Sequence, residues 1–169
     1  MEKTLRVLNR MVKAGVIEQY AIGGAVAAIF YIEPINTNDL DIFFHTKDES
    51  AGLDILAPLY DYLAGFGYKG HEETIEIEGW PVQFLPIFNP LLEEAVEQAK
   101  EIPFQRTKTR VIQAEHLVAI MLQTGRPKDQ ARILQFIEHD VLEPGRLTDI
   151  LGRHGLTEKW KQLNRRHAE

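Results

Sequence analysis

The sequence predicts a mixed α/β (α+β) fold, in which a mixed β-sheet is flanked by helices and followed by C-terminal helices. Two observations support this prediction. Short apolar or alternating stretches, typical of strands, are interspersed with helical patterns over the first two thirds of the chain, and every periodic stretch after Ala114 has helical spacing. The length of 169 residues suits one domain with a small helical appendage, and it is sufficient to bury a core without disulfides or a structural metal.

The first part of the chain is expected to alternate helices and strands. Leu5, Leu8 and Val12 have the i, i+3, i+7 spacing of an amphipathic helix that ends near Gly15. The elements expected next are a strand at Gln19–Ile22, a helix at Ala25–Tyr31, a strand at Leu40–His45, a helix at Leu53–Phe66, a hairpin of Thr74–Glu78 with Val82–Ile87, a helix at Pro90–Lys100 and a strand at Thr107–Ile112. Pro58 marks either a kink or the first turn of its helix.

The last third of the chain is expected to be helical. Turn signals at Gly125, Pro144 and Gly155 separate its apolar-periodic segments. No stretch rich in Pro, Gly or Ser divides two large domains. We therefore expect an α/β core over residues 1–113 and a C-terminal helical segment, packed on it, over residues 114–169.

Composition excludes several classes of protein. The chain has no cysteine, which excludes disulfides, thiolate metal sites and cysteine nucleophiles, and its single serine, Ser50, argues against a serine hydrolase. The longest apolar run, Ala21–Ile32, has 12 residues, whereas a membrane helix needs about 20. No signal or transit pattern begins the sequence. The expected location is cytoplasmic, without a membrane partner.

Charge is distributed unevenly along the chain, whose net charge is −6. Residues 1–99 contain 6 Lys and Arg against 16 Asp and Glu, whereas residues 100–169 contain 13 against 9. An acidic first part and a basic second part suit a metal site opposite an anionic ligand. Chance clustering of solvated charges gives the same pattern.

The most informative stretch contains a glycine pair and a carboxylate pair. Gly23 and Gly24, between a strand and a helix, allow close approach of the backbone to a ligand such as phosphate, although ordinary tight turns use the same residues. Asp39 and Asp41 are expected on one face of a strand, about 7 Å apart, where a shared cation such as Mg²⁺ would offset their repulsion. The alternative, two solvated strand caps, fits poorly with the apolar surroundings of Asp41.

Gly23-Gly24, a helix and then Thr37-x-Asp39-Leu40-Asp41 resemble the signature of the polymerase-β-like nucleotidyltransferase superfamily. The resemblance is strongest to small bacterial members related to abortive-infection and toxin–antitoxin nucleotidyltransferases. Downstream, a leucine-containing stretch at residues 115–120 and the Arg-Pro-Lys-Asp run at residues 126–129 are similar to the helical segment of that family, where a Lys-Asp pair follows a Leu-rich helix. The resemblance covers roughly residues 15–140.

The resemblance implies transfer of a nucleoside monophosphate from an NTP to an acceptor. Asp39 and Asp41 would be the catalytic carboxylates that hold Mg²⁺ or Mn²⁺, Gly23 and Gly24 the phosphate turn, and Lys128 a triphosphate contact. The acceptor stays open between a protein, an RNA such as tRNA and a small molecule. The choice of NTP and the oligomeric state also stay open.

Three positions depart from the family pattern. Ala25 stands where a hydroxyl residue is usual, Gln83 where many members have a third carboxylate that acts as a base, and Met121 near a frequent lysine. Glu76 and Glu78 on the partner strand are the nearest substitutes for the missing base in the sequence. These departures support an alternative, a weak or inactive nucleotidyltransferase fold that acts as a nucleotide-binding or toxin–antitoxin component.

Three cations are expected to gather near the start of one helix. Lys128 follows Pro127, which can open a helix, Arg126 precedes it, and Arg132 lies one turn further on. We expect all three to bind nucleotide phosphates across a cleft from the aspartates. In the alternative, this helix start is exposed and Arg132 pairs with Asp129. For the strands that hold Ile22, Asp41 and Gln83, we expect neighbouring positions in the sheet.

Overall fold

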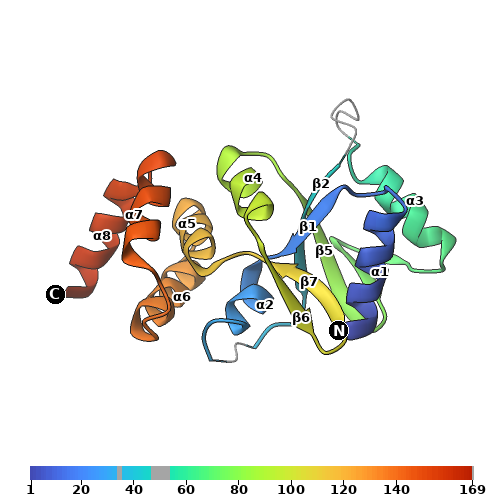
Figure 1. The fold of residues 1–169 in the computed structure, drawn as a ribbon, viewed down its shortest axis with the longest axis horizontal. Helices are drawn as coiled ribbons and strands as arrows, with labels where there is room; N and C mark the ends of the chain where they lie inside the picture. Colours follow the sequence, from blue (N-terminus) through green and yellow to red (C-terminus); the bar gives the residue numbers. More distant parts are fainter. Residues whose placement is uncertain (34–35, 47–53, 169) are drawn as a thin grey trace.

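The computed structural model describes residues 1–33, 36–46 and 54–168, in which a seven-stranded sheet lies between two groups of helices (Figure 1). The strands are β1 (Gln19–Ile22), β2 (Leu40–His45), β3 (Gly70–His71), β4 (Thr74–Ile77), β5 (Trp80–Pro86), β6 (Lys100–Phe104) and β7 (Thr107–Val111). The helices are α1 (Glu2–Lys13), α2 (Gly24–Ile29), α3 (Ala57–Gly65), α4 (Pro90–Glu97), α5 (Ala114–Thr124), α6 (Pro127–Glu138), α7 (Pro144–Arg153) and α8 (Thr157–Ala168).

The sheet is mixed, as the sequence predicts. Its strand order is β3-β4-β5-β2-β1-β7-β6, with parallel pairing of β2 to β5 and of β1 to β7 and antiparallel pairing elsewhere. The central strand β2 pairs Asp41 with Gln83 on β5, and Ile42 with Ile22 on β1. The strands that hold Ile22, Asp41 and Gln83 are therefore neighbours, as expected.

Helix α1 covers one face of the sheet. Leu5 and Leu8 are fully buried on it, in accordance with the predicted amphipathic spacing. The Thr4 hydroxyl donates to the Ile77 carbonyl of β4 at 3.1 Å, and the Asn9 amide donates to the Lys108 carbonyl of β7 at 2.8 Å. These two contacts show that α1 crosses the sheet from β4 to β7, while α2, α4 and α5 lie on the opposite side (Figure 1).

Strands β3 and β6 are absent from the sequence prediction, and both lie at the edges of the sheet. An edge strand buries little, so it has no continuous apolar or alternating pattern. Strand β6 also contains Pro103, which an edge tolerates because the missing N–H faces away from the ladder. The helix predicted to reach Lys100 ends earlier, at Glu97, because Lys100 is the first residue of β6.

Helix α3 begins at Ala57, later than predicted. Pro58 lies in its first turn, where the missing N–H costs no intrahelical hydrogen bond. Of the two readings of Pro58, a kink or a first turn, the structure has the first turn. The predicted start at Leu53 lies outside the described residues.

The predicted C-terminal helices are present as α5 to α8. Helix α5 packs against α2 and α4 of the α/β part, and α6 and α7 pack in turn against α5. The domain boundary near residue 113 stays a prediction. Within the described residues, no helix has both the length and the apolar character that crossing a bilayer requires.

One carboxylate joins α4 to the C-terminal helices. Glu94 of α4 accepts hydrogen bonds from the Nε2 atoms of His116 on α5, at 3.0 Å, and of His154 after α7, at 2.8 Å. The Arg153 guanidinium binds both of its oxygens. The hydrogen bonds from Arg153, followed by those from the histidines, lower the pKa of Glu94 well below its ordinary value of 4.5. We call these four residues the Glu94 cluster.

We expect Glu94→Gln to lower the free energy of unfolding by about 1.5–3 kcal/mol at pH 7, the range for hydrogen bonds to charged groups. Urea denaturation measures this difference. Glu97→Gln, an exposed position on the same helix, is the control and should change stability by less than about 0.5 kcal/mol.

The effect of Glu94→Gln should also depend on pH. Because the pKa of Glu94 is lower in the folded state, its stabilisation is complete above pH 4.5 and is lost as the pH falls below that value. The stability of wild type and variant should therefore converge below pH 4.5. A difference that stays constant on acidification would contradict the assignment.

Candidate active site

The glycine turn between β1 and α2 is shaped by β2. A Cβ atom on Gly23 would lie 2.4 Å from a ring carbon of Phe43, and one on Gly24 would lie 1.8 Å from Oδ2 of Asp41. Gly24 also has φ +56°, a left-handed conformation that other residues rarely adopt. Both positions therefore require glycine because the turn lies directly against the side chains of β2.

The amides of this turn are not equivalent. Gly23 N–H donates to the Asp41 carbonyl at 3.0 Å, so it cannot donate to a ligand. The amides of Gly24 and Ala25 belong to the first turn of α2 and have no partner inside the helix. Of the two glycines predicted to bind phosphate, only Gly24 lines the cavity, whereas the N–H group of Gly23 is already bound to β2.

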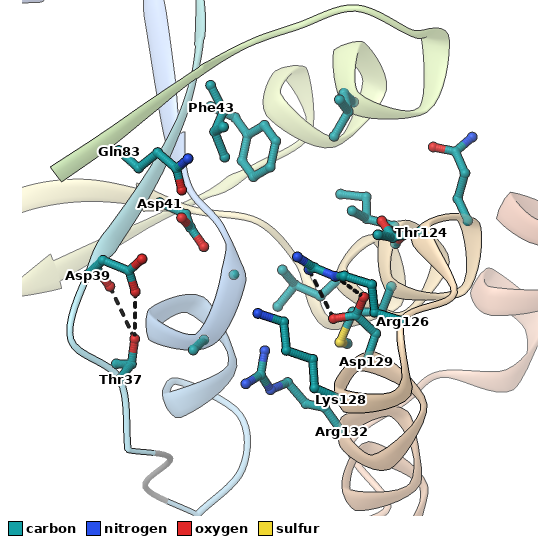
Figure 2. Close-up of a pocket in the computed structure, with 18 of the residues that line it drawn as sticks. Thr37, Asp39, Asp41, Phe43, Gln83, Thr124, Arg126, Lys128, Asp129 and Arg132 are labelled. Atoms are coloured by element: carbon teal, nitrogen blue, oxygen red, sulfur yellow. Dashed lines mark hydrogen bonds and ion pairs between the residues drawn. The ribbon is translucent and has the colours of Figure 1, made fainter. Parts of the chain in front are cut away.

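The two predicted carboxylates lie together at the start of β2 (Figure 2). Asp39 immediately precedes the strand, where its Oδ1 accepts a hydrogen bond from Thr37 Oγ1 at 3.3 Å. Asp41 is partly buried. Burial, and then the negative charge of Asp39, raise the pKa of Asp41 to about 6. Both causes would be relieved by a cation, since it solvates the carboxylates in place of water and offsets their repulsion.

Three cations lie across a cavity from Asp41 (Figure 2). Lys128, Arg126 and Arg132 each act to lower the pKa of Asp41 by their positive charge, although burial and Asp39 outweigh them. Among the described residues, Lys128 and Arg132 have neither a hydrogen bond nor an ion pair with another side chain. The sequence prediction that these cations face the acidic strand agrees with this geometry.

Arg126 is held differently from the other two cations. Its guanidinium binds Asp129 through two hydrogen bonds, of 2.7 and 3.1 Å, and the Asp129 side chain is 1 % exposed. The alternative considered from the sequence, in which Asp129 pairs with Arg132, is wrong. Asp129 anchors Arg126 at the start of α6, where the remaining face of the guanidinium is oriented toward the cavity (Figure 2).

The cavity between the two charged groups has a volume of about 860 Å³, within the range of small-molecule sites. Apolar side chains complete its lining, among them Leu85, Phe88, Ile120 and Met121. Phe88 is 81 % exposed, so most of its ring is accessible to a ligand or solvent. An elongated anion with one apolar end matches this arrangement of charges and surfaces.

No protein-family profile matches the chain, and no curated protein matches it in sequence. Several solved structures match its fold. An antigenic nucleotidyltransferase-like protein from Paracoccidioides brasiliensis superposes with a TM-score of 0.55 at 15 % identity, over 95 % of this chain and 91 % of the other. The chain has a nucleotidyltransferase-like fold.

The antibiotic-resistance factor ANT(2″)-Ia has the same fold in two structures. Its solution structure gives a TM-score of 0.50 at 15 % identity and covers 99 % of both chains. Its crystal structure in complex with adenylyl-2″-tobramycin gives 0.53 at 14 % identity, over 91 % of this chain and 97 % of the other. Identities this low establish the architecture and leave substrates and residue roles as proposals.

The nucleotidyltransferase-like fold places Gln83 directly beside Asp41, on the neighbouring strand. Gln83 Nε2 donates to Glu73 Oε2 at 3.2 Å. Neither Glu76 nor Glu78, the substitutes considered from the sequence, lines the cavity, and Glu78 accepts instead from the Tyr68 hydroxyl at 2.7 Å. Glu73 lies in the turn between β3 and β4, and no sequence pattern marked it because β3 itself was not predicted.

A second group of potential ligands lies at the other end of β2. Ligand atoms of His45, Glu93 and Glu97 lie within 4.8 Å of one another. The sequence does not predict this group, because these three residues have no metal-binding spacing. Both glutamates are exposed, and such groups are common in proteins without a bound ion, so we assign no metal here.

The contact between Gly24 and Asp41 makes a stability prediction. Gly24→Ala should destabilise the fold more than Gly79→Ala, because both residues have positive φ but only Gly24 lies against another side chain. We expect about 1–2 kcal/mol for Gly79→Ala, the cost of a left-handed conformation, and more for Gly24→Ala. Chemical denaturation measures both values. In an Asp41→Ala background, the additional destabilisation by Gly24→Ala relative to Gly79→Ala should largely disappear. Equal losses of unfolding free energy for the two glycine variants in the wild-type background would contradict the contact.

Proposed function

We propose that this protein transfers a nucleoside monophosphate from an NTP to an acceptor hydroxyl with the help of a divalent cation. The observation that carries the proposal is one cavity with two aspartates on one side and three cations on the other. A metal–triphosphate complex has the matching distribution of charge, a dication at the α-phosphate end and anionic oxygens beyond it.

The carboxylates fit a divalent cation such as Mg²⁺ or Mn²⁺. Asp39 and Asp41 are hard oxygen ligands, and their mutual repulsion raises the pKa of Asp41 further than burial alone. When bound, the cation would supply Lewis acidity and charge neutralisation at the phosphate oxygens. Two carboxylates alone form an incomplete Mg²⁺ site, so phosphate oxygens are expected to complete the coordination.

The cationic side of the cavity would bind the β- and γ-phosphates. Lys128 supplies an ammonium group and Arg132 a guanidinium, neither paired with a side chain in the described part of the chain, whereas Arg126 has a fixed orientation because Asp129 holds it. The N–H groups of Gly24 and Ala25 add donors on the opposite side. In the transfer, the acceptor oxygen bonds to the α-phosphorus as the bond to the bridging oxygen of the β-phosphate breaks, and pyrophosphate leaves.

The acceptor is proposed as a hydroxyl on a small molecule, a protein or an RNA such as tRNA. ANT(2″)-Ia, which shares the fold, has been crystallised with an adenylylated aminoglycoside. For this chain, kinship with the small bacterial toxin–antitoxin nucleotidyltransferases stays a prediction.

The alternative function is nucleotide binding without transfer, and Gln83 is the observation that favours it. An amide donates hydrogen bonds but does not accept a proton as a carboxylate does. Pyrophosphate release from NTP and Mg²⁺ distinguishes the two functions, because only transfer or hydrolysis breaks the bond between the α- and β-phosphates.

Asp39→Asn and Asp41→Asn should make nucleotide binding independent of the metal. Each substitution keeps the shape of the side chain but removes a charged ligand, so Mg²⁺ no longer gains affinity from the pair. Calorimetric titration of ATP, CTP, GTP and UTP, with Mg²⁺ and with EDTA, measures the dependence. If both variants keep the Mg²⁺ dependence of wild type, the metal lies elsewhere.

Lys128→Ala should weaken NTP binding at least tenfold at low salt and leave stability within about 0.5 kcal/mol, as expected for an exposed side chain. Lys13→Ala, at the exposed end of α1, removes the same charge far from the cavity and is the matched control. Calorimetry measures the affinities, and urea denaturation measures the stabilities. Equal NTP affinity for Lys128→Ala and wild type would contradict the phosphate site.

A further inference from the structure

Among the residues that the structure describes, no carboxylate lining the cavity is free to take a proton from an acceptor. The acidic lining residues are Asp39, Asp41 and Asp129. Asp129 is bound through both oxygens to Arg126, and Asp39 and Asp41 are assigned to the cation under the proposed function. A hydroxyl acceptor must nevertheless lose its proton when its oxygen bonds to phosphorus.

Glu73 is the carboxylate that the structure connects to this cavity. Its Oε2 accepts the hydrogen bond of 3.2 Å from Gln83 Nε2, and Gln83 lines the cavity as the register partner of Asp41. Gln83 therefore lies beside Asp41 in the sheet and holds Glu73 by a hydrogen bond, although Glu73 itself does not line the cavity. This arrangement also accounts for the amide at position 83, because an amide N–H can hold a neighbouring carboxylate, whereas a second carboxylate would repel it.

The turn that bears Glu73 has a defined conformation. It joins the short strands β3 and β4, and the preceding residue, Glu72, has φ +55°. The Thr74 hydroxyl donates to the His71 carbonyl across the turn at 3.2 Å. Glu73 is exposed, so an acceptor can reach its carboxylate from solvent.

We propose that Glu73 is the general base for the acceptor hydroxyl and that Gln83 is the residue that positions it. The inference rests on the proposed nucleotidyl transfer. The acceptor O–H bond breaks as its proton moves to a Glu73 oxygen, and the electron pair of that bond forms the new bond to the α-phosphorus. The bond from the α-phosphorus to the bridging oxygen breaks, and pyrophosphate leaves with that electron pair.

The test separates binding from chemistry. Glu73→Gln is compared with wild type and with Glu72→Gln, the adjacent residue in the same turn, for which the described residues show no hydrogen bond to the cavity lining. Calorimetry gives the affinity for each of the four NTPs with Mg²⁺. Single-turnover pyrophosphate release gives the rate with water, bulk tRNA or tobramycin as acceptor.

We expect Glu73→Gln to bind NTP within about twofold of wild type and to release pyrophosphate roughly 10²–10⁴-fold more slowly, the usual contribution of a positioned general base. Glu72→Gln should retain the wild-type rate. In the Glu73→Gln background, Gln83→Asp should restore part of the rate, because it returns a carboxylate to the side of Asp41.

Each other outcome is decisive. If Glu73→Gln releases pyrophosphate at the wild-type rate, the assignment of Glu73 as the general base is overturned. The same assignment is overturned if the wild type binds NTP but releases no pyrophosphate with any of the three acceptors. Loss of NTP affinity in Glu73→Gln shows that Glu73 is part of the nucleotide site and not the base. A wild type that binds no NTP overturns the proposed function itself.

Discussion

The close contact between the Gly24 backbone and the Asp41 carboxylate determines the geometry of the whole cavity. The turn after β1 can lie against β2 only because neither residue 23 nor residue 24 has a Cβ. This contact fixes where α2 begins, and therefore where α5 packs on it. The position of the cationic side of the cavity depends in turn on α5, because Arg126 follows it directly. The contact between Gly24 and Asp41 thus helps to set the distance between the two aspartates and the three cations.

The two charged groups come from different parts of the chain. The carboxylates belong to the acidic first part and the cations to the basic second part, so the uneven charge of the sequence becomes an electric field across one cavity. Burial strengthens this field because a low-dielectric environment screens less than water. The raised pKa of Asp41 shows that the three cations alone do not compensate for its burial and for Asp39.

The predictability of each element followed its burial. Strands β1, β2 and β5 were predicted because they are central and apolar, whereas β3 and β6 were missed because edge strands have no such pattern. Asp39 and Asp41 were recognised from local spacing, which a strand preserves in space. The link from Gln83 to Glu73 depends on the pairing of β4 with both β3 and β5, and sequence spacing contains no information on it. Spacing also could not decide which arginine binds Asp129, because both lie three residues from it.

The edges of the sheet have a consequence for how the protein behaves at high concentration. An open edge offers unpaired backbone groups to which the strand of another molecule can add, the first step of many aggregates. Here one edge, β3, has only two residues, and the other, β6, contains Pro103 between exposed charged residues and the turn to β7. Proline removes a donor, and Lys100 and Glu101 disfavour dry packing of a second sheet. Both edges are therefore poor templates for intermolecular strand addition, which favours a native state that resists cross-β association.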